Sequence, residues 1–249
     1  MSQQDPERAQ LPLISQRKSE HIALCASGDV EFRQKGTLLD QVQFVHQAIP
    51  ERHYDEIDLS TPLLGKVLKA PIVLSAMTGG TDEAQQINHD LARAAETLGL
   101  GFGLGSQRAM LVRPETTRTF QVREHAETAL VLGNIGLVQA ARMSTAEVRS
   151  LCKTVSVDAL CVHLATGMEL VQPGGDRDFR GGLDTLRRLH GELGIPIVVK
   201  ETGCGLSRQV GLMVREIGIT AVDVSGAGGT SWVGVETHRA EGVARAVGR

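Results

Sequence analysis

Residues 129–136 read A-L-V-L-G-N-I-G, an apolar run that ends in small and polar residues. The chain shows this pattern six times, with helical stretches between the runs. Such a series is typical of parallel strands whose carboxyl ends build a site. The motifs at those ends are A-M-T-G-G (76–80), G-S-Q-R (105–108), G-N-I-G (133–136), H-L-A-T-G-M-E (163–169), V-K-E-T-G-C-G (199–205) and D-V-S-G-A-G-G-T-S-W (223–232).

The polar residues at these strand ends recur at nearly regular intervals, roughly the length of one βα unit. Right-handed crossovers would wrap such units into an α/β fold of the TIM-type (β/α) barrel, of which six of eight units are present. A helix is expected over 83–99, closed by Gly99 and capped by Thr81 or Asp82. The strands are expected at 70–77, 100–105, 129–136, 158–165, 196–201 and 221–227.

Two regions differ in character along the chain. Residues 1–69 show too little periodicity to assign, and we expect them to form an N-terminal extension that carries R-K-S-E-H (17–21) over the barrel mouth. Residues 70–249 are expected to form the incomplete barrel. Since two further units are absent, we expect a protein of this length to bind cofactor poorly and to associate through open strand edges.

The composition limits the size class, the binding partners and the location that can be expected for this protein. A length of 249 residues with 41% hydrophobic content fits one barrel or two small domains. A net charge of −3 and 3% aromatic residues give no basis for binding nucleic acid or an anionic membrane. The polar N-terminus and the lack of a membrane-length apolar run predict a cytoplasmic protein. Its four cysteines show no C-x-x-C spacing, so we expect reduced packing residues at Cys25, Cys152, Cys161 and Cys204.

Two strand-end residues and one residue of the following loop suggest chemistry, each with a plainer alternative. Lys200 ends the apolar run P-I-V-V, where it faces either a ligand or a carboxylate such as Glu201. His163 is either a catalytic group or a satisfied core side chain. Glu169 is either solvated, like Asp176 in the same loop, or a ligand for a hard cation such as Mg²⁺.

Glycine-rich and basic motifs suggest an anionic ligand. The glycines after Thr78 and around Gly228 either form ordinary turns or let a flat or anionic ligand approach the backbone. Arg17 and Lys18 are either a solvated basic pair or a diphosphate clamp, and Arg108 would add a third cation.

Taken in this order and spacing, the motifs from about residue 17 onward closely resemble the type 2 isopentenyl-diphosphate isomerase family. The resemblance implies a flavin-dependent TIM barrel that interconverts isopentenyl and dimethylallyl diphosphate with reduced FMN and Mg²⁺. NADPH would serve only to reduce the flavin, so there is no net redox change. It also implies a homo-oligomer and makes the predicted barrel an FMN-binding one.

Site residues follow from the same resemblance. Catalytic roles would fall on His163, Met168, Trp232 and Glu236, with Trp232 as an aromatic wall for a carbocation-like state. Glu169 would bind Mg²⁺. FMN would contact Ser75, Ala76, Met77, Thr78, Ser106, Asn134, Lys200, Ser225 and Thr230. The substrate would contact Arg17, Lys18, His21, Ser106, Gln107 and Arg108.

The chain departs from the family pattern at two pocket positions. Where the family reads H-x-N-x-x-Q-E, this chain has Ala165 and Met168, and a thioether cannot donate the amide's hydrogen bonds. These departures favour one alternative, a catalytically silent relative that binds flavin or phosphate or serves in assembly. A second alternative is an FMN-dependent oxidase of the hydroxy-acid type. It is disfavoured because no arginine–histidine pair is recognisable near the late strands.

Overall fold

The structure is a computed structural model that describes residues 11–28 and 30–242. Residues 1–10 of the expected N-terminal extension, together with residues 29 and 243–249, lie outside the described part of the chain. Among the helices of that part, none is both long and apolar enough to cross a membrane.

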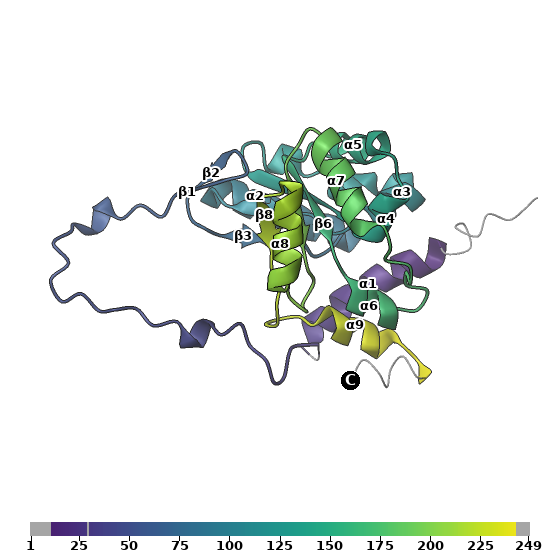
Figure 1. The fold of residues 1–249 in the computed structure, drawn as a ribbon, viewed down its shortest axis with the longest axis horizontal. Coiled ribbons are helices and arrows are strands. Elements are labelled where there is room, and N and C mark those ends of the chain that lie inside the picture. The colour runs from purple at the N-terminus through teal and green to yellow at the C-terminus, as the bar shows by residue number, and fades with distance from the viewer. Residues whose placement is uncertain (1–10, 29, 243–249) are drawn as a thin grey trace, which may run out of the picture.

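A curled sheet of six parallel strands forms the centre of the fold (Figure 1). Every neighbouring pair in the sheet is also consecutive along the chain, which is the connectivity of successive βα units. All six strands expected from the sequence are present, although shorter than the apolar runs. They are β3 (Val73–Leu74), β4 (Gly101–Gly103), β5 (Leu130–Gly136), β6 (Ala159–His163), β7 (Ile197–Lys200) and β8 (Ala221–Asp223).

Helices connect successive strands. The expected helix begins after Thr81, whose side chain accepts a hydrogen bond from the Ala84 amide, and ends at Gly99 with a left-handed φ of 65°. Two 3-10 segments, η4 (Pro114–Phe120) and η5 (Arg123–His125), lie between β4 and β5. The α-helices are α2 (Asp82–Leu98), α3 (Arg108–Val112), α4 (Leu137–Ala141), α5 (Thr145–Thr154), α6 (Thr166–Val171), α7 (Gly182–Glu192), α8 (Arg208–Ile217) and α9 (Trp232–Arg239).

Alternating side chains of the strands build two apolar clusters. On β5, Val131 joins the larger cluster, which includes buried residues of α2, α5, α7 and α8. Its neighbours Leu130 and Leu132 join a smaller cluster on the opposite face, with Leu68 of β2. Because both faces of the sheet are covered, the strands read as continuous apolar runs.

The N-terminal region contains a helix that the sequence pattern does not reveal. R-K-S-E-H lies within α1 (Leu11–Ser27), which contacts α9 (Figure 1). A long loop with two 3-10 turns, η2 (Leu39–Gln41) and η3 (Tyr54–Glu56), then projects from the domain. The hairpin of β1 (Thr61–Leu63) and β2 (Lys66–Leu68) leads back to the sheet.

The cysteines differ in their surroundings. Cys152 and Cys161 are buried as expected, and burial raises the pKa of each thiol to about 12. Cys25 is partly buried. The packing role expected for Cys204 is wrong, because this residue is exposed in a turn whose backbone amides bind the Glu201 carboxylate.

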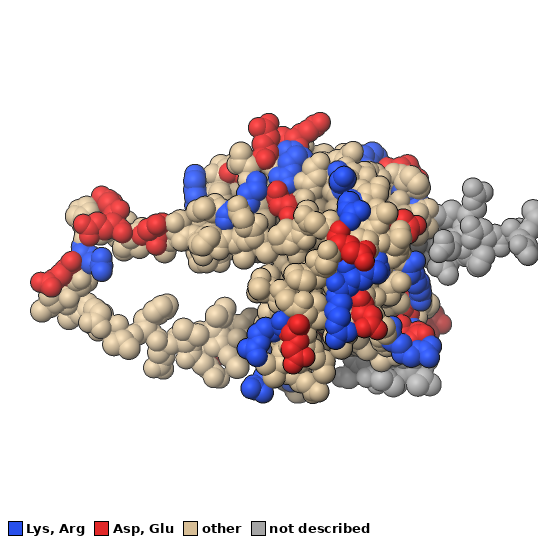
Figure 2. All heavy atoms as spheres, turned by 45° about the horizontal axis from the view of Figure 1, so that its top comes forward, with Lys and Arg blue, Asp and Glu red and all other residues tan. Residues whose placement is uncertain are grey.

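Positive and negative side chains are interspersed on the face of the molecule shown in Figure 2. Both kinds also occur on the projecting loop. This distribution is unlike the continuous basic surface of a nucleic-acid-binding protein.

Gly105 provides a test of how tightly the strand ends pack. A Cβ atom at Gly105 would lie 2.3 Å from the Thr78 carbonyl oxygen, which belongs to the backbone and cannot move aside. Gly105→Ala should therefore lower the free energy of unfolding by about 1–3 kcal/mol, measured by urea denaturation. Gly191→Ala is the matched control: nothing lies near its Cβ position within α7, so it should stabilise by about 0.5–1 kcal/mol. Equal stability of the two variants would contradict the packing argument.

Candidate functional site

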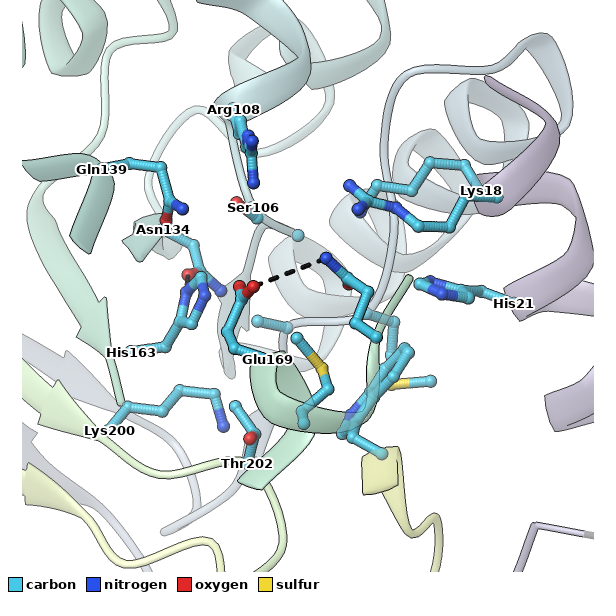
Figure 3. Close-up of a pocket in the computed structure, with 17 residues that line it drawn as sticks. Lys18, His21, Ser106, Arg108, Asn134, Gln139, His163, Glu169, Lys200 and Thr202 are labelled. Carbon is cyan, nitrogen blue, oxygen red and sulfur yellow. Dashed lines mark hydrogen bonds between the residues drawn. The ribbon is translucent and has the colours of Figure 1, made fainter. Parts of the chain in front are cut away.

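A pocket lies at the carboxyl ends of the parallel strands, between the sheet and helices α1, α6 and α9 (Figure 3). Segments that are far apart in the sequence meet there, as the strand-end pattern predicts. Four lining residues were not singled out from the sequence, namely Gly105, Gln139, Gln172 and Thr202. Those predicted as site residues and found in the lining are Arg17, Lys18, His21, Ala76, Met77, Ser106, Arg108, Asn134, His163, Met168, Glu169, Lys200 and Trp232.

The other predicted site residues lie around this pocket rather than in its wall. Ser75 is exposed, and Thr78 is buried with a side-chain oxygen that has no hydrogen-bond partner among the described residues. Ser225 accepts a hydrogen bond from Lys200, and Thr230 forms a β-bridge with Glu31. Ser225 and Thr230 therefore support the pocket from the loop that follows β8.

Gln107 is predicted to bind substrate, but its side chain is fully buried outside the pocket lining. Its Oε1 accepts a hydrogen bond from the backbone amide of Asn134 at 2.9 Å, and its Nε2 donates to the backbone carbonyl of Leu151 at 3.4 Å. In this structure Gln107 ties the end of β4 to the end of β5. A buried amide in a polar strand-end motif gives no sequence signal that separates the two roles.

Strand register places a charged row across the sheet. His163 pairs with Lys200, which in turn pairs with Asp223. The buried Lys200 ammonium lies 3.2 Å from Asp223 Oδ2 and donates hydrogen bonds to Ser225 Oγ and the Glu201 carbonyl. Its carboxylate partner is thus Asp223 and not Glu201. These contacts offset the desolvation of the buried ammonium group and fix the orientation of the Lys200 side chain.

His163 is held as a neutral imidazole. Its Nδ1 lies 2.8 Å from Asn134 Oδ1, so Nδ1 carries the proton and donates. Burial lowers the pKa of His163 to about 3, with smaller contributions from the charges of Lys200, Lys18 and Arg108. The ring therefore enters the pocket uncharged near neutral pH.

Glu169 lies in the centre of the pocket on α6 (Figure 3). Its Oε2 accepts hydrogen bonds from the Asp176 amide at 2.8 Å and from Gln172 Nε2 at 3.4 Å. Burial raises the pKa of Glu169, and the charge of Asp176 adds to this, while the hydrogen bond from the Asp176 backbone amide and the charges of Arg108 and Arg17 act against it. Both Glu169 and Asp176 are shielded from solvent, which is the opposite of the solvated alternative. No group of three or more metal-binding side chains occurs among the residues described.

Three cations converge on the same cavity. Arg17 and Lys18 come from α1, and Arg108 is the first residue of α3. Burial and, to a smaller extent, the charges of Arg17 and Arg108 lower the pKa of Lys18 to about 8, while the charge of Glu236 acts against them. Arg17 Nε is also buried without a hydrogen-bond partner in the described structure. Mutually repelling cations around a cavity indicate an anionic ligand.

A buried pair joins α1 to α9 beside these cations. His21 Nε2 lies 2.8 Å from Oε1 of Glu236, whose side chain has 0% exposure. The His21 ring also meets the Trp232 ring edge-on, with centroids 5.3 Å apart. Glu236 thus lies behind His21 and Trp232, which themselves line the pocket.

Comparison with known proteins gives consistent matches. The profile of the family described as FMN-dependent dehydrogenase matches residues 12–163. Isopentenyl-diphosphate delta-isomerase of Methanosarcina mazei is 44% identical over 228 residues, covering 91% of this chain and 62% of the relative. The enzyme of the same name from Methanothermobacter thermautotrophicus is 44% identical over 230 residues (92% and 64%), and that of a Synechococcus species is 45% identical over 228 (91% and 66%).

The chain spans less than two thirds of the length of these relatives. Among solved structures, the carboxyl transferase domain of Rhizobium etli pyruvate carboxylase matches with a TM-score of 0.42 and 16% identity, over 71% of this chain and 32% of that one. This likeness is too low to bear on fold or function.

The tautomer of His163 is directly measurable. We expect the imidazole to remain neutral, with the proton on Nδ1, at about pH 6, because the folded state keeps its pKa near 3 rather than 6.5. The unfolded chain takes up this proton as pH falls below about 6.5, so this group lowers the free energy of unfolding at acid pH. Nitrogen chemical shifts of ¹⁵N-histidine-labelled protein, assigned with His163→Gln, would report the state. An imidazolium signal at about pH 6 would contradict the assignment.

Proposed function

The chain belongs to the FMN-dependent dehydrogenase family and, within it, to the type 2 isopentenyl-diphosphate isomerases, and we propose that it interconverts isopentenyl and dimethylallyl diphosphate. The observation that carries this proposal is the convergence of Arg17, Lys18 and Arg108 on one cavity with Glu169 at its centre. Reduced FMN and Mg²⁺ would take part, and NADPH would serve to reduce the flavin. A cytoplasmic location and a homo-oligomeric state remain predictions from the sequence.

The three cations suit a diphosphate better than a singly charged anion. They come from two helices and line one pocket, so together they can contact oxygens of both phosphate groups. The Ser106 hydroxyl can donate a hydrogen bond to a phosphate oxygen without adding charge, whereas the neutral His163, whose only proton is donated to Asn134, presents a hydrogen-bond acceptor to the pocket. Binding the anion would also relieve the repulsion that lowers the pKa of Lys18.

The sheet side of the pocket fits a flat cofactor. Ala76 and Met77 present small or apolar surface, and Gly105 packs directly against the Thr78 backbone. Asn134 and Lys200 can direct polar atoms to a flavin ring, and Ser225 in the next loop accepts a hydrogen bond from Lys200. When bound, reduced FMN would supply proton transfer at the alkene. Lys200, held by Asp223, would keep a fixed positive charge beside the ring.

Glu169 fits a magnesium site in which phosphate oxygens and water supply most ligands. Its Oε2 is held by the Asp176 amide, so the carboxylate is already oriented. Asp176 is held by Arg142 at 2.8 Å and so stabilises the loop that orients Glu169. A metal ion would favour the ionised form of Glu169, against the effect of burial.

Met168 and Ala165 favour a second candidate function, a silent relative that binds flavin or phosphate. Met168 lines the pocket beside Glu169, where family members place an amide. Its thioether fills space but cannot donate a hydrogen bond to the substrate. Of the other residues predicted to be catalytic, His163 and Trp232 line the pocket, whereas Glu236 is fully buried behind His21.

The two functions are separated by one assay. Purified protein supplied with FMN, reductant and Mg²⁺ is incubated with isopentenyl diphosphate, and the products are followed by mass spectrometry after dephosphorylation. An isomerase forms dimethylallyl diphosphate until equilibrium. Stoichiometric flavin and diphosphate binding without product would instead identify the silent relative.

The diphosphate end should respond to loss of charge. Lys18→Ala should raise KM, and Glu169→Gln should weaken Mg²⁺-dependent substrate binding, each by about 1.5–3 kcal/mol, since both replace charge-assisted contacts. Lys153→Ala, which removes an exposed lysine on α5, is the control and should leave KM unchanged. Wild-type KM in both pocket variants would refute the assignment, whereas an effect of Glu169→Gln that does not depend on Mg²⁺ would refute the metal role only.

Met168 can be tested by restoring the amide. If the missing amide positions the alkene or relays a proton, Met168→Gln should raise kcat by roughly a hundredfold, alone or together with Ala165→Asn. Met168→Leu retains an apolar side chain of similar volume and should leave kcat unchanged. If kcat is the same in all variants of the flavin-loaded protein, the thioether is a neutral replacement and the silent-relative candidate loses its main support.

A further inference from the structure

Arg239 bridges two carboxylates on different helices. On α9, its Nη1 lies 2.6 Å from Oε2 of Glu236, and its Nε lies 2.6 Å from Oε2 of Glu20 on α1. The side chain of Arg239 is 15% exposed and Glu20 is 37% exposed. Neither residue lines the pocket. The bridge therefore acts at the back of the helix that carries Arg17 and Lys18.

Glu236 makes this bridge necessary. Its carboxylate is fully buried, and its two oxygens are taken by His21 and Arg239. Burial alone would raise the pKa of Glu236, but the hydrogen bonds and charges of His21 and Arg239 outweigh burial and lower it. Removing one partner of such a buried pair leaves a charge that is poorly compensated.

The other charged groups around Glu236 come from α1. The negative charge of Glu236 acts to raise the pKa of both Arg17 and Lys18. Helix α6 also packs on α9, and its Glu169 acts on Arg17. The contact between α1 and α9 thus places two pocket cations next to a carboxylate whose ionisation depends on Arg239.

We propose that Arg239 is a positioning residue which, through Glu20 and Glu236, docks α1 so that Arg17 and Lys18 face the diphosphate. The proposal rests on the proposed function only for the identity of the anion. Arg239 touches no substrate. It fixes the position of α1, whose residues Arg17 and Lys18 contact the substrate, and it keeps Glu236 ionised beside His21.

A simpler explanation must be separated from this one. Arg239 is itself a cation that acts on Arg17, so its removal would weaken anion binding by charge alone. Glu20 distinguishes the two. Glu20→Gln removes a negative charge near the site, so charge alone predicts tighter binding of an anion. If the Glu20–Arg239 contact instead holds α1 in place, its loss predicts weaker binding of the anion.

The test measures the dissociation constant of inorganic pyrophosphate by calorimetry, with Mg²⁺, for the wild type and five variants. We expect Glu20→Gln and Arg239→Gln to weaken binding by roughly threefold to tenfold or more, and the double variant to be no weaker than Arg239→Gln. Arg239→Lys should recover part of the loss. Arg187→Gln, which breaks an exposed ion pair on α7, is the matched control and should bind as the wild type does.

Dependence on pH gives a readout that packing alone would not change. Glu236 has a lowered pKa in the folded protein, so its pairing is lost only as pH falls through that value. Without the Arg239 cation the pKa rises, and the carboxylate protonates at higher pH. The ratio of the dissociation constant of Arg239→Gln to that of the wild type should therefore grow as pH is lowered from neutral.

Pyrophosphate binding as tight as the wild type, or tighter, in Glu20→Gln would overturn the proposal. This result can be obtained even if Arg239→Gln does not fold, since Glu20 is partly exposed and its variant removes no buried charge. The proposed function fails separately, in the isomerisation assay of the wild type. Pyrophosphate binding involves no chemistry at the alkene, so either idea can be refuted without the other.

Discussion

Parallel, in-register pairing of β6, β7 and β8 is the constraint on which the site depends. It sets His163, Lys200 and Asp223 side by side at one edge of the sheet. Lys200 can stay buried because Asp223 lies next to it, and its charge in turn disfavours protonation of His163. A slip by one residue would turn each of these side chains to the other face. Chemistry and fold are therefore fixed by the same hydrogen-bond ladder.

The second half of the site comes from the N-terminal helix. The cations of α1 and α3 that line the pocket repel one another, so the arrangement needs support from outside the cavity. Glu236 provides the opposite charge, and its burial makes the attraction strong but conditional on its partners. Anion binding and helix docking are thus coupled through one carboxylate.

Much of this could be predicted from the sequence, because an apolar run followed by a polar residue marks both a strand and its functional end. All six strands and most pocket residues follow from that pattern, and the caps of α2 follow from the preferences of Thr and Gly at helix ends. The pattern does not reveal α1. It also cannot show Gln107 turning inward or Arg239 reaching Glu20, since those contacts join residues far apart in the chain. Asp223 is the first residue of a strand-end motif, but only the strand register identifies it as the partner of Lys200.

A crystal structure of the protein with pyrophosphate would test the central claim most directly. The account predicts that the anion lies between the α1 cations Arg17 and Lys18 on one side and Arg108 on the other, with Glu169 at its edge and the His21–Glu236 contact intact. Pyrophosphate bound away from either side, or bound with α1 displaced from α9, would contradict it.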